Sequence, residues 1–189
     1  TSLENNNVMF GYCINLTSFE GDLSSLTSCN SMFMGCSSLT TFTSDLSSLT
    51  SGYCMFQNCS GLTTFTTDLS SLTNGSRMFY GCSSLTTFTP DLSSLTNGGV
   101  MFYGCSNLET FTSDLSSLQD GGGEQLLKSG MFGGCSKLTN FISDLSSLQY
   151  GAGMFAGCSL NTESLIHIAE TIQDVHHLTD NTRYEGYNV

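Results

Sequence analysis

Residues 55–77 read MFQNCSGLTTFTTDLSSLTNGSR, and near-copies of this stretch fill most of the chain. The pair Met-Phe opens each copy and recurs at a constant interval, the length of that stretch, except for a single longer step. The pairs stand at 9–10, 32–33, 55–56, 78–79, 101–102, 131–132 and 154–155. The sequence is therefore a tandem repeat, and its one long step carries seven extra residues within 120–128.

Each copy places its apolar residues at the same positions. All 13 phenylalanines fall on two rows, the second of which trails the Met-Phe pair by nine residues. The rows are Phe10, Phe33, Phe56, Phe79, Phe102, Phe132 and Phe155, and Phe19, Phe42, Phe65, Phe88, Phe111 and Phe141. A single unit cannot bury its apolar face, whereas stacked units bury one another's. We therefore predict a solenoid whose coils lie ~4.8 Å apart where their strands pair.

Within a coil, residues 62–66 alternate Thr with an inward Phe65 and are predicted to form a short strand. The following segment, 68–72, is too short for an α-helix, and its leading Asp68 indicates a capped helical or 3₁₀ turn. Asn74-Gly75 and, in the next coil, Asn97-Gly98 indicate turns with positive φ. The predicted coil thus has one short parallel strand, with short helical or 3₁₀ turns opposite it.

The pattern changes after Cys158. Residues 161–178 read as an amphipathic helix that caps the last coil, with Asn161 or Thr162 as its N-cap. Its apolar stripe is Leu165, Ile168, Ala169, Ile172 and Val175. The predicted organisation is a segment 1–8, a solenoid of about 6.5 repeats over 9–160, the helix, and a polar tail 179–189. Because residue 1 is Thr rather than Met, we expect the natural N-terminus to lie elsewhere.

The charge of the chain restricts its partners. Sixteen acidic residues against four basic ones give a net charge of −12. Binding to a phosphate backbone or an anionic membrane requires clustered Lys and Arg, so we predict no nucleic-acid partner and no membrane docking. We predict no membrane insertion either, because the sequence has no run of 18 apolar residues.

The most prominent outward feature is a pair of threonine rows. They flank the inward phenylalanine of four successive coils and comprise Thr41, Thr43, Thr64, Thr66, Thr87, Thr89, Thr110 and Thr112. On a strand these residues point to the same face, and we take them as candidate ligand-binding residues. High β-propensity on a solvated sheet explains the rows equally well. Ser18, Glu20, Asn140 and Ile142 interrupt the rows at the two ends.

Two further rows carry ionisable groups. One Asp per coil forms a row that suggests calcium, but a lone carboxylate per coil is too few ligands, and capping of its own turn is favoured. Seven cysteines form another row, which we interpret as buried free thiols rather than a zinc site. Adjacent coils would also bring these cysteines within disulfide range. Cys29 and Cys54 lie off this row and are expected to be exposed.

The repeats contain no catalytic set. The three histidines lie at 167, 176 and 177, outside the repeats, so no Ser/His/Asp arrangement is indicated. We predict no enzyme activity, no metal site and no cofactor. The insertion within 120–128 is a second candidate binding element, through Glu124, Gln125, Leu126 and Leu127, because solenoid insertions often form functional loops.

The order Leu-x-x-Phe, Asp-Leu-Ser-Ser-Leu, Met-Phe-x-Gly-Cys-Ser-x-Leu resembles the BspA-like, Treponema-type leucine-rich repeats. Residues 78–85, Met-Phe-Tyr-Gly-Cys-Ser-Ser-Leu, match them best, and the likeness covers roughly 9–160. The resemblance implies a right-handed leucine-rich-repeat solenoid and an extracellular or cell-surface location. It also implies a binding or adhesion role towards protein or glycan. The alternatives are a structural spacer or receptor-recognition segment of a larger surface or phage assembly and, as a minor one, an ice-binding Thr array.

Overall fold

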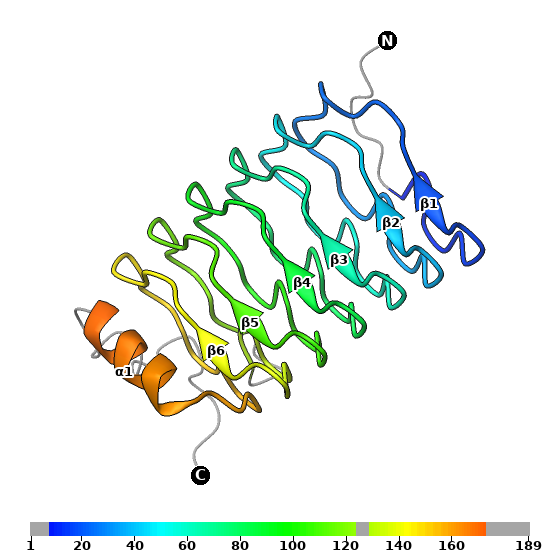
Figure 1. The fold of residues 1–189 in the computed structure, drawn as a ribbon. Helices are drawn as coiled ribbons and strands as arrows, with labels where there is room; N and C mark the ends of the chain where they lie inside the picture. The colour runs from blue at the N-terminus through cyan, green and yellow to red at the C-terminus, as the bar shows by residue number, and fades with distance from the viewer. Residues whose placement is uncertain (1–7, 124–128, 173–189) are drawn as a thin grey trace, which may run out of the picture.

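The computed structural model describes residues 8–123 and 129–172 and shows a stack of coils that ends in one helix (Figure 1). The strands follow one another along one side of the stack. They are β1 Ser18–Phe19, β2 Thr41–Phe42, β3 Thr64–Phe65, β4 Thr87–Phe88, β5 Thr110–Phe111 and β6 Asn140–Phe141, and the helix is α1 Thr162–Thr171. The predicted repeat solenoid, with one short parallel strand per coil and a C-terminal helix, is confirmed.

The strands are shorter than the segment 62–66 that the sequence predicted. They pair in parallel as β1–β2, β3–β4 and β5–β6, with each phenylalanine opposite the next. The predicted length is wrong because the backbone N–H of Leu62 bonds back to the carbonyl of Cys59 at 3.0 Å. That hydrogen bond makes the beginning of the expected strand a turn.

A second line of backbone pairing runs through the coils outside the strands. Single parallel bridges join Ser28, Ser51, Asn74, Asn97, Asp120 and Tyr150 in succession. The side-chain Oδ1 atoms of Asn74 and Asn97 each accept the backbone N–H two residues on, at 3.0 Å. The coils are thus tied together at this line as well as at the strands.

The glycine after each of these asparagines does not have the positive φ that the sequence predicts. Gly75 and Gly98 do not have positive φ; the left-handed positions are instead occupied by glycines such as Gly81 and Gly104, at φ 72° and 74°. A Cβ on Gly75 would lie 2.9 Å from Sδ of Met101 in the next coil. Gly75 is therefore required by close packing between coils, not by its backbone angles.

The core is a continuous stack of like residues. Ring centroids lie 5.3–5.6 Å apart along the row of Phe10 and 5.7–6.1 Å apart along the row of Phe19. Rings of the two rows meet at steep angles with centroids 4.7–5.5 Å apart. Edge-to-face and offset pairs of this kind are favourable beyond the area they bury.

The aspartate row caps its own turns, as predicted. In six coils the Oδ1 atom accepts the backbone N–H of the serine two residues on, at 2.7–3.1 Å. The leucines that flank the two serines close the turn with one hydrogen bond of 2.8–3.0 Å. These serine donors lower the pKa of Asp22 and Asp45, because hydrogen bonds stabilise the carboxylate.

None of the nine cysteines, all of which lie in the described residues, forms a disulfide bond. Six of the row donate Sγ–H to the phenylalanine carbonyl of the preceding coil at 3.0–3.2 Å. Burial raises the pKa of Cys59 to about 12 and that of Cys158 to about 11. The expectation that Cys29 and Cys54 are exposed is wrong, because both are almost fully buried, and Cys54 occupies the position that buried Val100 takes two coils later.

The insertion does not disturb the stack. Residues 124–127, named above as a candidate binding element, lie outside the described residues. On one side of them, the N–H of Gly121 donates to Tyr150 at 2.8 Å, and on the other, that of Gly130 donates to Gly153 at 2.6 Å. The ring centroids of Phe102 and Phe132, which bracket the insertion, are 5.4 Å apart, as in the other steps.

Candidate functional site

The predicted threonine rows lie on the solvent side of the strands. All eight side chains are exposed, and the phenylalanine between each pair is buried. Parallel pairing sets Thr64 opposite Thr87, so the rows are in register from coil to coil. Because every strand has the same position for its inward phenylalanine, the stack presents its outward threonines on one face.

The hydroxyls of the rows have no partner in the part of the chain that the structure describes. Neighbouring threonines behave differently, since Thr40 and Thr86 donate their hydroxyls to carbonyls of the preceding coil at 3.1 Å. A hydroxyl both donates and accepts hydrogen bonds, so the rows offer uncommitted partners of both kinds.

The C-terminal end of the sheet is covered by α1. The Oδ1 atom of the N-cap Asn161 accepts the N–H of Ser164 at 2.8 Å. The Ser164 hydroxyl in turn accepts the N–H of Phe141 at 2.8 Å and donates to the carbonyl of Thr139 at 3.2 Å. One side chain thereby satisfies a backbone donor of β6 and the carbonyl just before that strand, and the N–H of Asn161 also donates to the carbonyl of Thr139, at 2.9 Å.

The face of α1 that packs on the core is not the apolar stripe that the sequence predicted. Ser164 is fully buried, and Ile168 and Ile172 pack on the core, whereas Leu165 and Ala169 are exposed. Within the described residues the helix ends at Thr171, because Ile172 has extended backbone angles. Residues 173–178 of the predicted helix, including Val175, and the predicted tail 179–189 lie outside the described residues.

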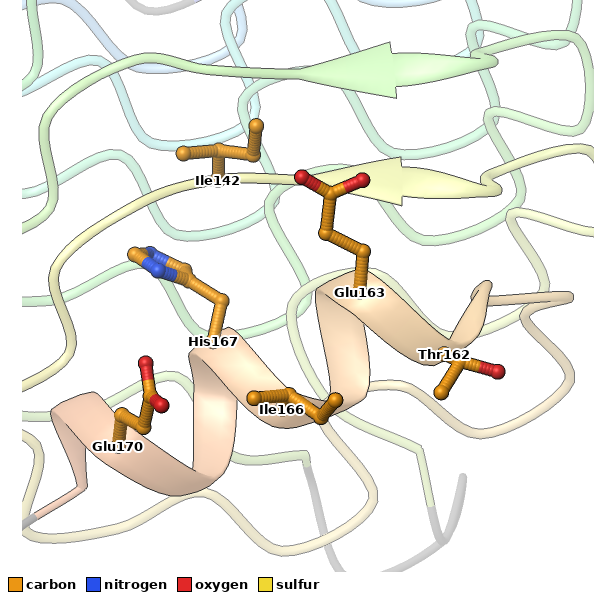
Figure 2. Close-up of a pocket in the computed structure, with 6 residues that line it drawn as sticks. All are labelled: Ile142, Thr162, Glu163, Ile166, His167 and Glu170. Atoms are coloured by element: carbon orange, nitrogen blue, oxygen red, sulfur yellow. The ribbon is translucent and has the colours of Figure 1, made fainter.

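A groove of about 490 Å³ lies between α1 and the segment after β6. Its lining residues are Ile142, Thr162, Glu163, Ile166, His167 and Glu170. Figure 2 shows Glu163 and His167 extending from α1 towards the segment that carries Ile142. Ile142 stands where the preceding coil has Thr112, so the groove begins where the threonine row ends.

The groove has fixed and apolar walls. Nε2 of His167 lies 3.1 Å from the carbonyl oxygen of Ser143, and because a carbonyl only accepts, Nε2 donates this hydrogen bond. Ile142 and Ile166 are 43% and 54% exposed, although side chains of this kind are usually buried. The repeat pattern does not predict the groove, and its one sequence signal is Ile142 at an outward strand position.

Neither a metal centre nor a membrane-spanning helix is found in residues 8–123 and 129–172. No three His, Cys, Asp or Glu side chains of these residues are placed to hold a metal ion. Over the same residues, no helix has the length and apolar character needed to cross a bilayer.

Comparison with known families identifies the repeat. The family model of the BspA type leucine rich repeat region matches six copies, over residues 4–122 and 114–177. The chain belongs to the BspA-type leucine-rich repeat family. Leucine-rich repeats of this kind generally serve as protein-interaction modules and are typically non-catalytic. BspA-type proteins are typically associated with the cell surface.

Solved structures of leucine-rich repeat proteins are also similar. One from Bacteroides ovatus is 27% identical, with a TM-score of 0.55, over 85% of this chain and 41% of that one. This BspA-type chain therefore spans less than half the length of that relative. A leucine-rich repeat protein of T. pallidum is 19% identical over 87% of this chain and 75% of that one, and its TM-score of 0.44 supports no inference. A search of curated proteins finds no match.

Proposed function

We propose that the chain is a non-enzymatic binding module, extracellular or at the cell surface, that recognises protein or glycan through its threonine rows. The observation that carries this proposal is the set of eight exposed hydroxyls without a partner in the described residues, held in register on four coils. The rows contain no charged side chain. Recognition there would use hydroxyls and methyl groups rather than ion pairs, so it should depend little on salt.

The rigidity of the rows favours binding. Threonine is β-branched and has few χ1 rotamers, and the strands beneath rest on a core of stacked phenylalanine. These side chains would therefore lose little conformational freedom when a ligand binds, which lowers the entropy cost of association.

A comparison of valine variants on protein and glycan microarrays tests the proposal. The variant Thr64→Val/Thr66→Val/Thr87→Val/Thr89→Val keeps the shape and β-propensity of the central rows and removes four hydroxyls. We expect it to lose at least about tenfold in affinity for whatever the unmodified chain captures, at about 0.5 kcal/mol or more per hydrogen bond. Unchanged capture by a folded variant would contradict the proposal.

The matched control is Thr73→Val/Thr96→Val. These threonines lie in the other line of coil-to-coil pairing, where their hydroxyls donate to the carbonyls of Thr50 and Thr73 at 3.0 Å. The control should keep ligand capture unchanged while it lowers thermal stability slightly.

A structural spacer in a larger surface or phage assembly is the second candidate. The uniform ring spacing along the stack and the greater length of the Bacteroides relative favour it. Deletion of residues 55–100 removes two whole units, including four threonines of the rows. A spacer should become shorter and keep its partners, whereas the proposed binding module should lose affinity.

Ice binding is the minor alternative. Regular exposed threonine rows suit it, but Glu20 and Ile142 bound the rows after four coils. A measurement of thermal hysteresis on the intact chain separates this alternative, since a protein or glycan binder should show none.

A further inference from the structure

The groove between α1 and β6 has a chemistry that the threonine rows lack. Its two isoleucines are each about half exposed and face solvent from two different elements, the segment after β6 and α1. Exposed β-branched side chains that the fold leaves uncovered lose contact with water when a partner's apolar group enters between them. The groove therefore favours an apolar side chain as its central occupant.

Acidic groups stand on both sides of this apolar centre. Glu163 and Glu170 line the groove from two turns of α1, with Ile166 and His167 between them. At a rise of ~1.5 Å per residue, the Cα atoms of these two glutamates lie about 10 Å apart along the helix axis. None of the six lining residues is Lys or Arg. The two carboxylates thus face any occupant without a compensating cation among the lining residues.

We propose that this groove binds an extended basic segment of a partner protein. An apolar side chain of the segment lies between Ile142 and Ile166, and a Lys or Arg on each side reaches Glu163 and Glu170. Side chains two residues apart point to the same face of an extended chain, so two bases that flank one apolar residue stand four residues, or about 13 Å, apart at about 3.3 Å per residue. The long side chains of Lys or Arg can converge from there on the two carboxylates. The motif is therefore a base, any residue, an apolar residue, any residue and a second base.

The rest of the molecule supports this partner chemistry. The chain carries 16 acidic residues against four basic ones, so its field attracts a cationic segment before contact. The Asp144 carboxylate, exposed in the same coil as Ile142, adds to that field near the groove. The hydrogen bond from His167 to Ser143 keeps one wall in place, which reduces the ordering that binding requires.

The test uses the intact chain and a fluorescein-labelled peptide, Gly-Ser-Lys-Ser-Ile-Ser-Lys-Ser-Gly, in fluorescence anisotropy at about 50 mM salt, where screening is weak. We expect saturable binding. Two further peptides, with Glu in place of both Lys or Ser in place of Ile, should each bind at least about tenfold more weakly. Equal binding of the Glu peptide, or no saturation by the intact folded chain, would overturn the proposal.

Protein variants locate the binding. Glu163→Gln/Glu170→Gln should weaken the Lys peptide about fivefold, since exposed ion pairs are weak individually. Ile166→Ser should weaken it about tenfold through lost apolar contact. The matched control Glu20→Gln/Glu109→Gln removes the same two charges from exposed residues outside the groove and should change affinity less than about twofold. Equal weakening by the control would show that net charge alone attracts the peptide, and the groove proposal would fail.

Two other occupants have distinct signatures. If a second copy of this chain fills the groove, light scattering will show a dimer that Ile166→Ser dissociates. If residues 173–189 fill it, the peptide will bind only after their removal. Either outcome replaces the proposed partner.

The inference rests on the proposed function only in taking a protein as the partner class. The variant with four valines in the threonine rows should bind the peptide as the unmodified chain does. Failure of the groove and failure of the rows are therefore separate results.

Discussion

The central coils, residues 32–122, and the C-terminal end, residues 131–172, differ in what covers the edge of each strand. In the central coils each strand is covered by a coil of nearly the same sequence, and like residues stack on like. At the C-terminal end a helix takes the place of the next coil, and the hydroxyl of Ser164 takes the place of backbone groups. The outward row also changes there from threonine to Ile142. Repetition therefore provides stability and a uniform face, whereas the end provides a local surface unlike any other.

The largest expected effect comes from alkaline pH, which acts on the interior of the stack. Burial raises the pKa of Cys59 to about 12 and also raises the pKa of Cys82 and Cys105 well above its usual range. The unfolded chain, with thiol pKa values near about 8.5, releases these protons first, so stability is full below about pH 8 and falls as pH rises towards about 12. Each buried thiol should cost about 1.4 kcal/mol per pH unit in that window.

Urea denaturation at about pH 7.5 and about pH 10 checks this expectation. The midpoint should fall sharply at the higher pH, and Cys82→Ala should reduce the fall, whereas Cys13→Ala, at the exposed N-terminal coil, should leave it unchanged. A midpoint that is the same at both values would contradict the assignment of buried, protonated thiols.

The second expected effect compares the same residue in the middle and at the end. Phe79 is fully buried between rings on both sides, whereas Phe155 is half-buried and has a stacked neighbour on one side only. Phe79→Ala should cost about 3–5 kcal/mol of unfolding free energy. Phe155→Ala should cost clearly less in the same urea titration. Equal losses would mean that the end coil is packed as firmly as the centre.

A third, smaller effect tests the contact between coils. Gly75→Ala places a methyl group 2.9 Å from Sδ of Met101 and should cost about 2 kcal/mol by overpacking. Gly122→Ala, whose nearest neighbour is the Asp120 side chain at 3.3 Å, serves as a control of the same chemistry and should cost less. Thermal unfolding measures both variants. A midpoint for Gly75→Ala that is not lower than that for Gly122→Ala would contradict the expected contact with Met101.

The smallest expected effect concerns the helix that closes the stack. Ser164→Ala leaves the N–H of Phe141 without its partner and should cost about 1–2 kcal/mol. Amide hydrogen exchange at Phe141 should become faster, while exchange at Phe88 in a central coil stays slow. Thr162→Ala, on the exposed side of the same helix, is the matched control. Unchanged exchange at Phe141 would show that the Ser164 hydroxyl does not protect the N–H of Phe141.

The parts of the fold that the sequence predicted are those that repeat. Phe65 belongs to a row of six equivalent phenylalanines, so periodicity alone placed it inside, and the same logic placed Thr64 outside. Asp68 was assigned correctly because its contact is with Ser70, two residues away. Contacts that are local in the sequence or that repeat in successive coils can therefore be predicted from the sequence alone.

Relations between different coils were not predictable in the same way. The need for Gly75 comes from Met101 in the following coil, and the sequence pattern Asn-Gly pointed to a local turn instead. The face that α1 turns towards the core is set by the hydrogen bond between the Ser164 hydroxyl and the N–H of Phe141 in β6. The spacing of apolar residues along a helix does not predict such a hydrogen bond. The groove could not be predicted without that orientation of the helix, because it forms where α1 presents Glu163 and His167 towards the segment that carries Ile142.

The unbroken ring spacing across the insertion has a practical consequence. The sequence between Phe102 and Phe132 is longer than that between Phe79 and Phe102, yet the two pairs of ring centroids are 5.4 Å and 5.6 Å apart. The number of residues that connect these two coils therefore does not determine the distance between them. We expect that a foreign peptide or a fluorescent label inserted at this point would leave the spacing of the coils unchanged.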